Sequence, residues 1–130
     1  MPEIKLIDMR GGTTRIAQSV QPLPEDPYQR QHLTDDPDTT RAQWRALIHD
    51  ATFAVRYAAA SSHHIPPELL VLMVVDGHPF VRAAVAHNPR TPDYALKALI
   101  KDADPKVREV AQTTQARLHA TPNQGPELSR

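Results

Sequence analysis

Four arginines recur at a fixed interval of 26 residues, and the guanidinium group is well suited to binding anions. The column consists of Arg30, Arg56, Arg82 and Arg108. If one surface of the fold presents these groups together, they can bind phosphate or an acidic peptide through charge-assisted hydrogen bonds.

A structural role for the same column is the interpretation we favour. Three of the arginines follow an aspartate by six residues, which predicts Asp–Arg pairs that tie adjacent units together, and a buried arginine without a partner would be costly. The predicted pairs are Asp50/Arg56, Asp76/Arg82 and Asp102/Arg108. Arg30 follows Pro24 instead, so we expect Arg30 to lack an acidic partner and to be free to contact a ligand.

The seven histidines do not form a recognisable metal-binding pattern. A metal site needs three or four converging ligands, whereas the adjacent His63 and His64 point in different directions and no H-x₃-H pair is present. His78 occupies the helix-start position that Asp104 takes one unit later, so we interpret His78 as a capping residue. We predict neither a metal nor a cofactor.

Catalytic motifs are also missing, and we predict that the protein is not an enzyme. The chain has no cysteine, no G-x-S-x-G motif and no phosphate-binding loop, since Gly11-Gly12 lacks the spacing such a loop requires. The acidic pairs Asp35-Asp36 and Asp102/Asp104 fall at turns, where aspartate is common as a cap.

Composition limits the remaining functional classes. Among the 130 residues, 15 basic and 15 acidic side chains cancel, which argues against a protein dedicated to gripping nucleic-acid phosphates. No apolar run reaches the roughly 18 residues that span a bilayer, and the first residues lack the pattern of a secretory signal. We therefore expect a cytoplasmic protein with no membrane partner.

Each 26-residue interval contains two helical signals. The first begins with a cap-plus-proline pair such as Asp104-Pro105 and ends at Asn88-Pro89, because proline disfavours a helical residue before it. The second begins at Thr91-Pro92-Asp93 and presents Leu96, Leu99 and Ile100 to the core. Apolar residues at helical spacing mark the buried face of the first helix, at Val55/Ala58/Ala59, Val81/Ala84/Val85 and Val107/Val110/Ala111.

The repeat predicts an all-α fold, a short α-solenoid of about four two-helix repeats. We divide the chain into an extended N-terminal arm (1–23), a repeat domain (24–118, with units 25–50, 51–76, 77–102 and 103–118) and a flexible C-terminal tail (119–130). The end units carry polar residues where the inner units are apolar, for example Gln29 and the run 112–115, so we interpret both as caps.

The segment from Val81 through Pro92, followed by Leu96, Leu99 and Asp102, resembles the leucine-rich repeat variant family, which is related to HEAT-type solenoids. This resemblance covers about residues 25–118. It implies units of an α-helix paired with a short 3₁₀- or α-helix, wound into a right-handed superhelix. One member of that family carries an N-terminal cysteine cluster for iron and sulfur, and since this chain has no cysteine, no cofactor is carried over. The residues Pro92 to Lys101 also predict a genuine α-helix.

Candidate partner-binding residues lie where repetition fails or where second helices face outward. They are Arg30, Trp44, Arg90, Asp93, Tyr94 and Lys97. Trp44 stands at the core position of Leu70 and Leu96, so packing is the favoured role and contact with a partner is the alternative. The segment Ile4–Ile7 either covers the end of the stack or adds to a partner's sheet edge.

Stacked units provide an extended surface and little else, so we predict a non-enzymatic protein–protein interaction module, an adaptor or accessory subunit. The partner is a protein, and self-association through the unit ends is possible. The alternative is a HEAT-like nucleic-acid-binding solenoid. Its phosphate contacts would come from basic residues on second helices and adjoining turns, namely Arg41, Arg45, Arg90, Lys97, Lys101 and Lys106.

Overall fold

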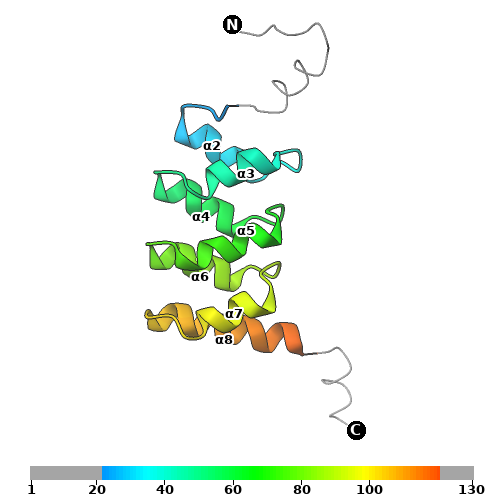
Figure 1. Cartoon of the computed structure of the whole chain (residues 1–130), viewed down its shortest axis with the longest axis vertical. Coiled ribbons are helices and arrows are strands. Elements are labelled where there is room, and N and C mark those ends of the chain that lie inside the picture. Colours follow the sequence, from blue (N-terminus) through cyan, green and yellow to red (C-terminus); the bar gives the residue numbers. More distant parts are fainter. Residues whose placement is uncertain (1–21, 121–130) are drawn as a thin grey trace, which may run out of the picture.

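The computed structural model describes residues 22–120, which form a single stack of helices (Figure 1). Most of the predicted arm, including Ile4–Ile7, and most of the predicted tail lie outside these residues. The described part contains no strand, so the predicted all-α solenoid is confirmed. Its elements are α2 (Pro27–Leu33), α3 (Arg41–Leu47), α4 (Phe53–Ser61), α5 (Pro67–Leu72), the 3₁₀-helix η1 (Met73–Val75), α6 (Pro79–His87), α7 (Asp93–Leu99) and α8 (Pro105–His119).

The helices form two layers. The first helix of each unit packs on the first helix of the next, so α2, α4, α6 and α8 follow one another along the stack (Figure 1). The second helices α3, α5 and α7 form the other layer. The predicted α-helix at the second position of unit three is confirmed as α7, whereas the corresponding α5 tightens into η1 in its last turn.

Side-chain caps mark the start of three first helices, α2, α6 and α8, whereas Thr52 before α4 makes no capping hydrogen bond. The Asp104 carboxylate accepts hydrogen bonds from the backbone N–H groups of Lys106 and Val107, and proline follows as the first helical residue. His78 takes the same role, since its Nδ1 atom accepts from the N–H of Phe80 at 3.1 Å. The predicted capping role of His78 is therefore confirmed.

The core is aliphatic and repeats with the unit. Val55, Val81 and Val107 are fully buried at the same register of α4, α6 and α8. Trp44 is 2% exposed among the second-layer core residues, which confirms its packing role. Ala58 and Val110, predicted to belong to the buried face, are only half-buried, because these positions face the open side of the first layer. The second-layer core also contains Leu47, Leu70, Met73, Leu96 and Leu99.

The repeated arginines form ion pairs with aspartates, and we call this series of pairs the Arg–Asp ladder. The aspartate that each arginine binds is not the one that the sequence predicted. Each carboxylate partner comes 20 residues after its arginine rather than six residues before it, in the ion pairs Arg30–Asp50 (2.6 Å), Arg56–Asp76 (2.9 Å) and Arg82–Asp102 (2.8 Å). The residue six before contributes its backbone carbonyl instead. Since a carbonyl needs no acidic side chain, Pro24 serves Arg30 as well as an aspartate would, at 3.0 Å from Nη1.

Arg30 is therefore not free, and the prediction that it lacks an acidic partner is wrong. The end of the ladder is at the other terminus. Nη1 of Arg108 donates to the carbonyl of Asp102 at 2.7 Å as in the other units, but within residues 22–120 no carboxylate pairs with Arg108. The ladder ends there because α8 continues where the other units turn into a second helix.

A second set of bonds joins the units at the opposite ends of the first helices. Nδ2 of Asn88 donates to the carbonyls of Ala60 (2.8 Å) and Ser62 (2.9 Å) in the preceding unit, and Oγ of Ser62 donates to the carbonyl of Thr34. Thr114 holds the same register in unit four, is 1% exposed, and makes no side-chain hydrogen bond with the described residues.

The end units differ from the inner ones as a finite stack requires. Gln29 is exposed at the register where Val55 is fully buried. At the other end α8 runs for 15 residues, because Thr114 and Gln115 replace the Asn88-Pro89 stop signal. Helix α8 packs against both α6 and α7 and so covers both layers at once.

Candidate functional site

The candidate residues on the second layer lie on and before α7. Tyr94 is 66% exposed and Lys97 is also exposed, so both side chains are available to a partner. Arg90 is partly engaged, since its Nε donates to the carbonyl of Ile65 at 2.9 Å and ties two loops together.

Asp93 is the most heavily engaged of these residues. Its carboxylate lies 3.0 Å from Nε2 of His119, 3.3 Å from Nε2 of Gln115 and 3.6 Å from Nζ of Lys97. The hydrogen bond from Gln115 has the largest effect and lowers the pKa of Asp93. Desolvation opposes it, and the contacts with His119 and Lys97 add to the lowering, so that the pKa lies below its ordinary value. Asp93 thus fastens the end of α8 to α7.

The side chains of the remaining candidates, Arg30 and Trp44, contact other parts of the protein. Arg30 belongs to the ladder, and its guanidinium group donates hydrogen bonds to the Asp50 carboxylate and to the carbonyl of Pro24. Trp44 is almost wholly buried and leaves little surface for a partner.

The ladder carboxylates show how strongly their arginines bind them. Burial raises the pKa of Asp50 and of Asp102, but the hydrogen bonds from Arg30 and Arg82 and from nearby backbone N–H groups outweigh this effect. The pKa of each carboxyl group therefore lies below its ordinary value. The arginines Arg30, Arg56 and Arg82 are therefore bound to carboxylates of the protein itself, and the ladder stabilises the stack.

The basic residues of the second layer are interrupted at α5, which contains Glu68 but no lysine or arginine. Arg41 pairs with Glu68 at 2.6 Å, and Lys97 lies near Asp93. Lys106 lies on a first helix rather than a second one and approaches Glu109 at 3.5 Å. This interleaving of charge gives no specific support to a phosphate-binding surface.

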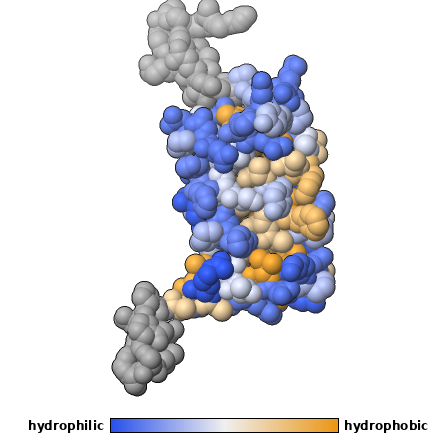
Figure 2. All heavy atoms as spheres, turned by 180° about the vertical axis from the view of Figure 1, so that it is seen from behind, coloured by the Kyte–Doolittle hydropathy of each residue, from blue (hydrophilic) through white to orange (hydrophobic). Residues whose placement is uncertain are grey.

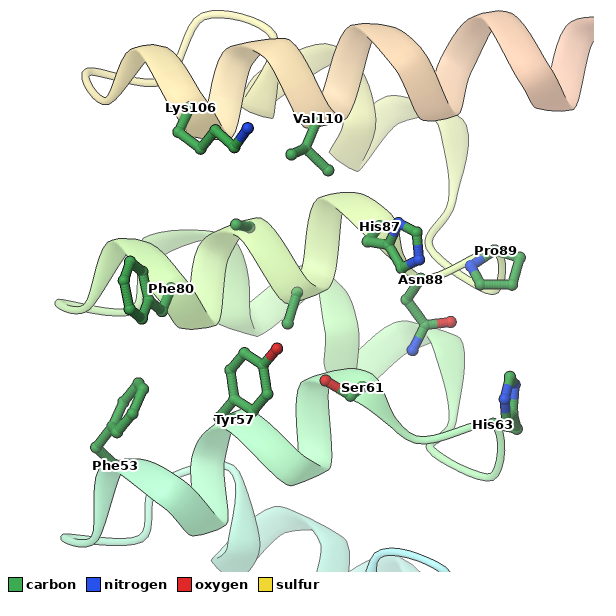
Figure 3. Close-up of a pocket in the computed structure, with 12 residues that line it drawn as sticks. Phe53, Tyr57, Ser61, His63, Phe80, His87, Asn88, Pro89, Lys106 and Val110 are labelled. Carbon is green, nitrogen blue, oxygen red and sulfur yellow. The ribbon is translucent and has the colours of Figure 1, made fainter.

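A groove on the first layer has a volume of about 730 Å³. It crosses α4, α6 and α8, and Figure 3 shows side chains from all three helices pointing into it. Its lining residues are Phe53, Tyr57, Ser61, His63, Phe80, Ala83, Ala84, His87, Asn88, Pro89, Lys106 and Val110. A second hollow of about 410 Å³ between α2 and α4 shares Phe53, Tyr57 and Ser61 with it.

An aromatic cluster forms one end of this groove. The Phe53 ring stacks on the imidazole of His78 at a centroid distance of 4.1 Å, and Phe80 lies 5.2 Å from His78 and 6.3 Å from Phe53. Phe80 is 62% exposed and Tyr57 is 45% exposed. These rings leave apolar surface in contact with water, and Figure 2 shows hydrophobic atoms gathered toward the right of this face, with hydrophilic atoms to their left and above them.

The sequence contains a signal for this cluster that the repeat analysis missed. Phe53 stands where the other three units have proline, and His78 stands where units one and four have aspartate. Both changes preserve the start of a helix, and together they place two rings in contact. These two departures from the 26-residue repeat, at adjacent positions of the unit, are the sequence signal for the aromatic cluster.

Other kinds of site have no geometric support in the described residues. Within residues 22–120 no three histidine, aspartate or glutamate side chains come together as metal ligands could. None of the helices in this part of the chain combines the length and hydrophobicity required to cross a bilayer.

Comparison with known proteins gives one match. Residues 79–104, one complete 26-residue unit from the start of α6 to the cap of α8, match the family described as Leucine rich repeat variant. This match confirms the resemblance noted in the sequence. No curated protein and no solved structure matches the chain.

Proposed function

We propose that this protein is a non-enzymatic protein-binding module whose partner occupies the groove across α4, α6 and α8. The observation that carries the proposal is that the exposed aromatic rings of Phe80 and Tyr57 line one groove that crosses three helices. A folded protein gains nothing in stability from leaving a phenylalanine 62% exposed, whereas a partner that covers it gains the hydrophobic free energy of burial.

The family match supports this role at a general level. Helical repeat units form extended surfaces by stacking, and such surfaces commonly bind other proteins. The adaptor or accessory-subunit role follows from the small size of the stack.

The second layer is the weaker candidate for the binding surface. Asp93 and Arg90 already hydrogen-bond within the protein, and only Tyr94 offers a large exposed ring there. Tyr94 is therefore the natural control for Phe80, since the two aromatic side chains are similarly exposed on opposite layers.

The test is a partner affinity measured with matched variants. A protein retained from the source lysate is identified, purified, and titrated calorimetrically against the wild type, Phe80→Ala and Tyr94→Ala. We expect Phe80→Ala to weaken binding about tenfold or more, as for a central interface residue, and Tyr94→Ala to leave it unchanged. The reverse pattern would move the interface to α7.

A further inference from the structure

The groove has a distinctive distribution of charge. None of its twelve lining residues is an aspartate or glutamate, whereas Lys106 and the imidazoles of His63 and His87 are among them. Figure 3 shows His63 and His87 at the end of the groove opposite the Phe53–Phe80 cluster, with Lys106 reaching in from α8. An apolar segment with carboxylates therefore meets no like charge within the lining.

Two acidic side chains, Glu109 and Asp35, lie near the groove without lining it. The Glu109 carboxylate lies 3.5 Å from Nζ of Lys106, but both side chains are about 70% exposed. Water therefore screens this ion pair, and Lys106 can still bind a carboxylate of a ligand. The acidic Asp35 lines the adjoining hollow at α2, together with His32. Carboxylates of a ligand are thus directed to the α6–α8 part of the groove and away from α2.

The dimensions of the groove match a short peptide. Packed helices lie about 8–10 Å apart, so three successive first helices span roughly 16–20 Å. An extended chain covers this distance with about five or six residues. Apolar side chains fit the space between the aromatic cluster and the small residues Ala83 and Ala84.

We propose that the groove binds a short segment of a partner protein in which apolar side chains alternate with aspartate or glutamate. This inference rests on the proposed function and specifies the chemistry of the partner. Phe53, Tyr57 and Phe80 contact the apolar side chains, and Lys106 pairs with a carboxylate. Lys106 repels a basic segment, and none of the twelve lining residues offers it a carboxylate.

Three labelled eight-residue peptides provide the probe for the full-length protein, with affinity measured by fluorescence anisotropy. The first contains leucine and phenylalanine among aspartate and glutamate. The second replaces every acidic residue with lysine, and the third replaces the leucine and phenylalanine residues with serine. We expect the first peptide to bind at least about tenfold more tightly than either of the others.

Two substitutions locate the binding. Phe80→Ala should weaken the acidic peptide about tenfold, and Lys106→Glu should weaken it severalfold while improving the basic peptide. Tyr94→Ala should have no effect. Phe80 and Lys106 are exposed, so each variant should fold, which a circular dichroism melt verifies; Lys106→Gln repeats the test without adding a charge.

Several results would overturn this assignment. They are equal affinity for the acidic and basic peptides, a Lys106→Glu variant that binds the acidic peptide as the wild type does, and a dimer in sedimentation experiments that Phe80→Ala dissociates, since the occupant would then be a second copy. If no peptide binds while an identified partner still requires Phe80, the proposed function stands and this partner chemistry is wrong. If the partner is indifferent to Phe80, the proposed function itself fails.

Discussion

The Arg–Asp ladder and the first-layer groove belong to the same stack but differ in how far their residues repeat along the sequence. Ladder positions repeat every 26 residues, and the Arg82 and Asp102 side chains, for example, are only 17% and 8% exposed. Groove positions do not repeat, since Phe80 corresponds to Tyr28, Ala54 and Lys106 in the other units. Repetition in this protein marks residues that hold units together, and its failure marks surface that is available to a partner.

The same contrast applies to hydrogen bonding. Arg82 uses Nε and Nη2 for the Asp102 carboxylate and Nη1 for the carbonyl of Asp76. Tyr57 and Phe80 in the groove contribute exposed ring surface instead. Substitutions in the two regions should therefore separate stability from binding.

The largest loss of stability is expected in the repeated core. Leu99→Ala removes a side chain that is 1% exposed and should lower the free energy of unfolding by about 2–5 kcal/mol. Leu72→Ala is the matched control, because Leu72 is 55% exposed, and its effect should stay within about 0.5 kcal/mol. Urea denaturation measures both. Equal effects would contradict the burial pattern on which the unit alignment depends.

Breaking the ladder should have the next largest effect. Arg82→Ala leaves the Asp102 carboxylate, which is 8% exposed, without its partner and should cost about 3 kcal/mol. Arg108→Ala should cost clearly less in the same urea titration, since Arg108 bonds only to backbone carbonyls among the described residues. Equal losses from the two substitutions would show that the carboxylate pairing contributes little.

The ladder should also make stability sensitive to acid. Because the pKa values of Asp50 and Asp102 are lowered in the folded protein, both stabilise it fully above the unfolded value of about 3.8. This contribution is lost as the pH falls below that value toward the folded pKa. Asp102→Asn should therefore destabilise the protein at pH 7, and its deficit relative to wild type should shrink between pH 4 and pH 2.5 in urea titrations. A constant deficit would contradict the assignment.

The smallest expected change is a gain. Thr114→Val replaces a buried hydroxyl that makes no side-chain hydrogen bond with the described residues, and should raise the free energy of unfolding by about 1 kcal/mol. The equivalent change Asn88→Val should instead destabilise, because Asn88 bonds to two carbonyls of the preceding unit. Thermal unfolding of the two variants provides the comparison, and a destabilised Thr114→Val would indicate that the hydroxyl has a partner.

Most of the scaffold was predictable from sequence because it depends on local rules. Asp104-Pro105 and Asn88-Pro89 mark the start and end of first helices through capping and the geometry of proline, and the structure places both as predicted. Helix α7 and the burial of Leu96 and Leu99 follow from apolar spacing alone.

The ladder partners were harder to predict because Arg56 and Arg82 each have two candidate aspartates in the repeat. Asp76 is six residues before Arg82 and Asp102 is 20 residues after it, and sequence spacing favours the nearer one. In the fold the nearer residue offers its carbonyl and the farther one its carboxylate. Only the packing of unit against unit distinguishes the two.

The groove was missed because the departures from the repeat that drew attention, at Arg30 and Trp44, did not include Phe53, His78 or Phe80. Phe53 replaces the proline that begins the other first helices, and His78 replaces a capping aspartate, but both residues still permit a helix and so neither disturbs the predicted elements. Their stacking at 4.1 Å joins positions 25 residues apart and depends on how α4 and α6 pack. The exposure of Phe80 likewise follows from the packing of whole units.

Site-specific photo-cross-linking in the source cells tests the central claim most directly. A photoreactive phenylalanine derivative is placed at position 80 in one sample and at position 94 in another. The account predicts a cross-linked protein partner from position 80 and none from position 94. A partner captured only from position 94, with none from position 80, would contradict the assignment of function to the groove.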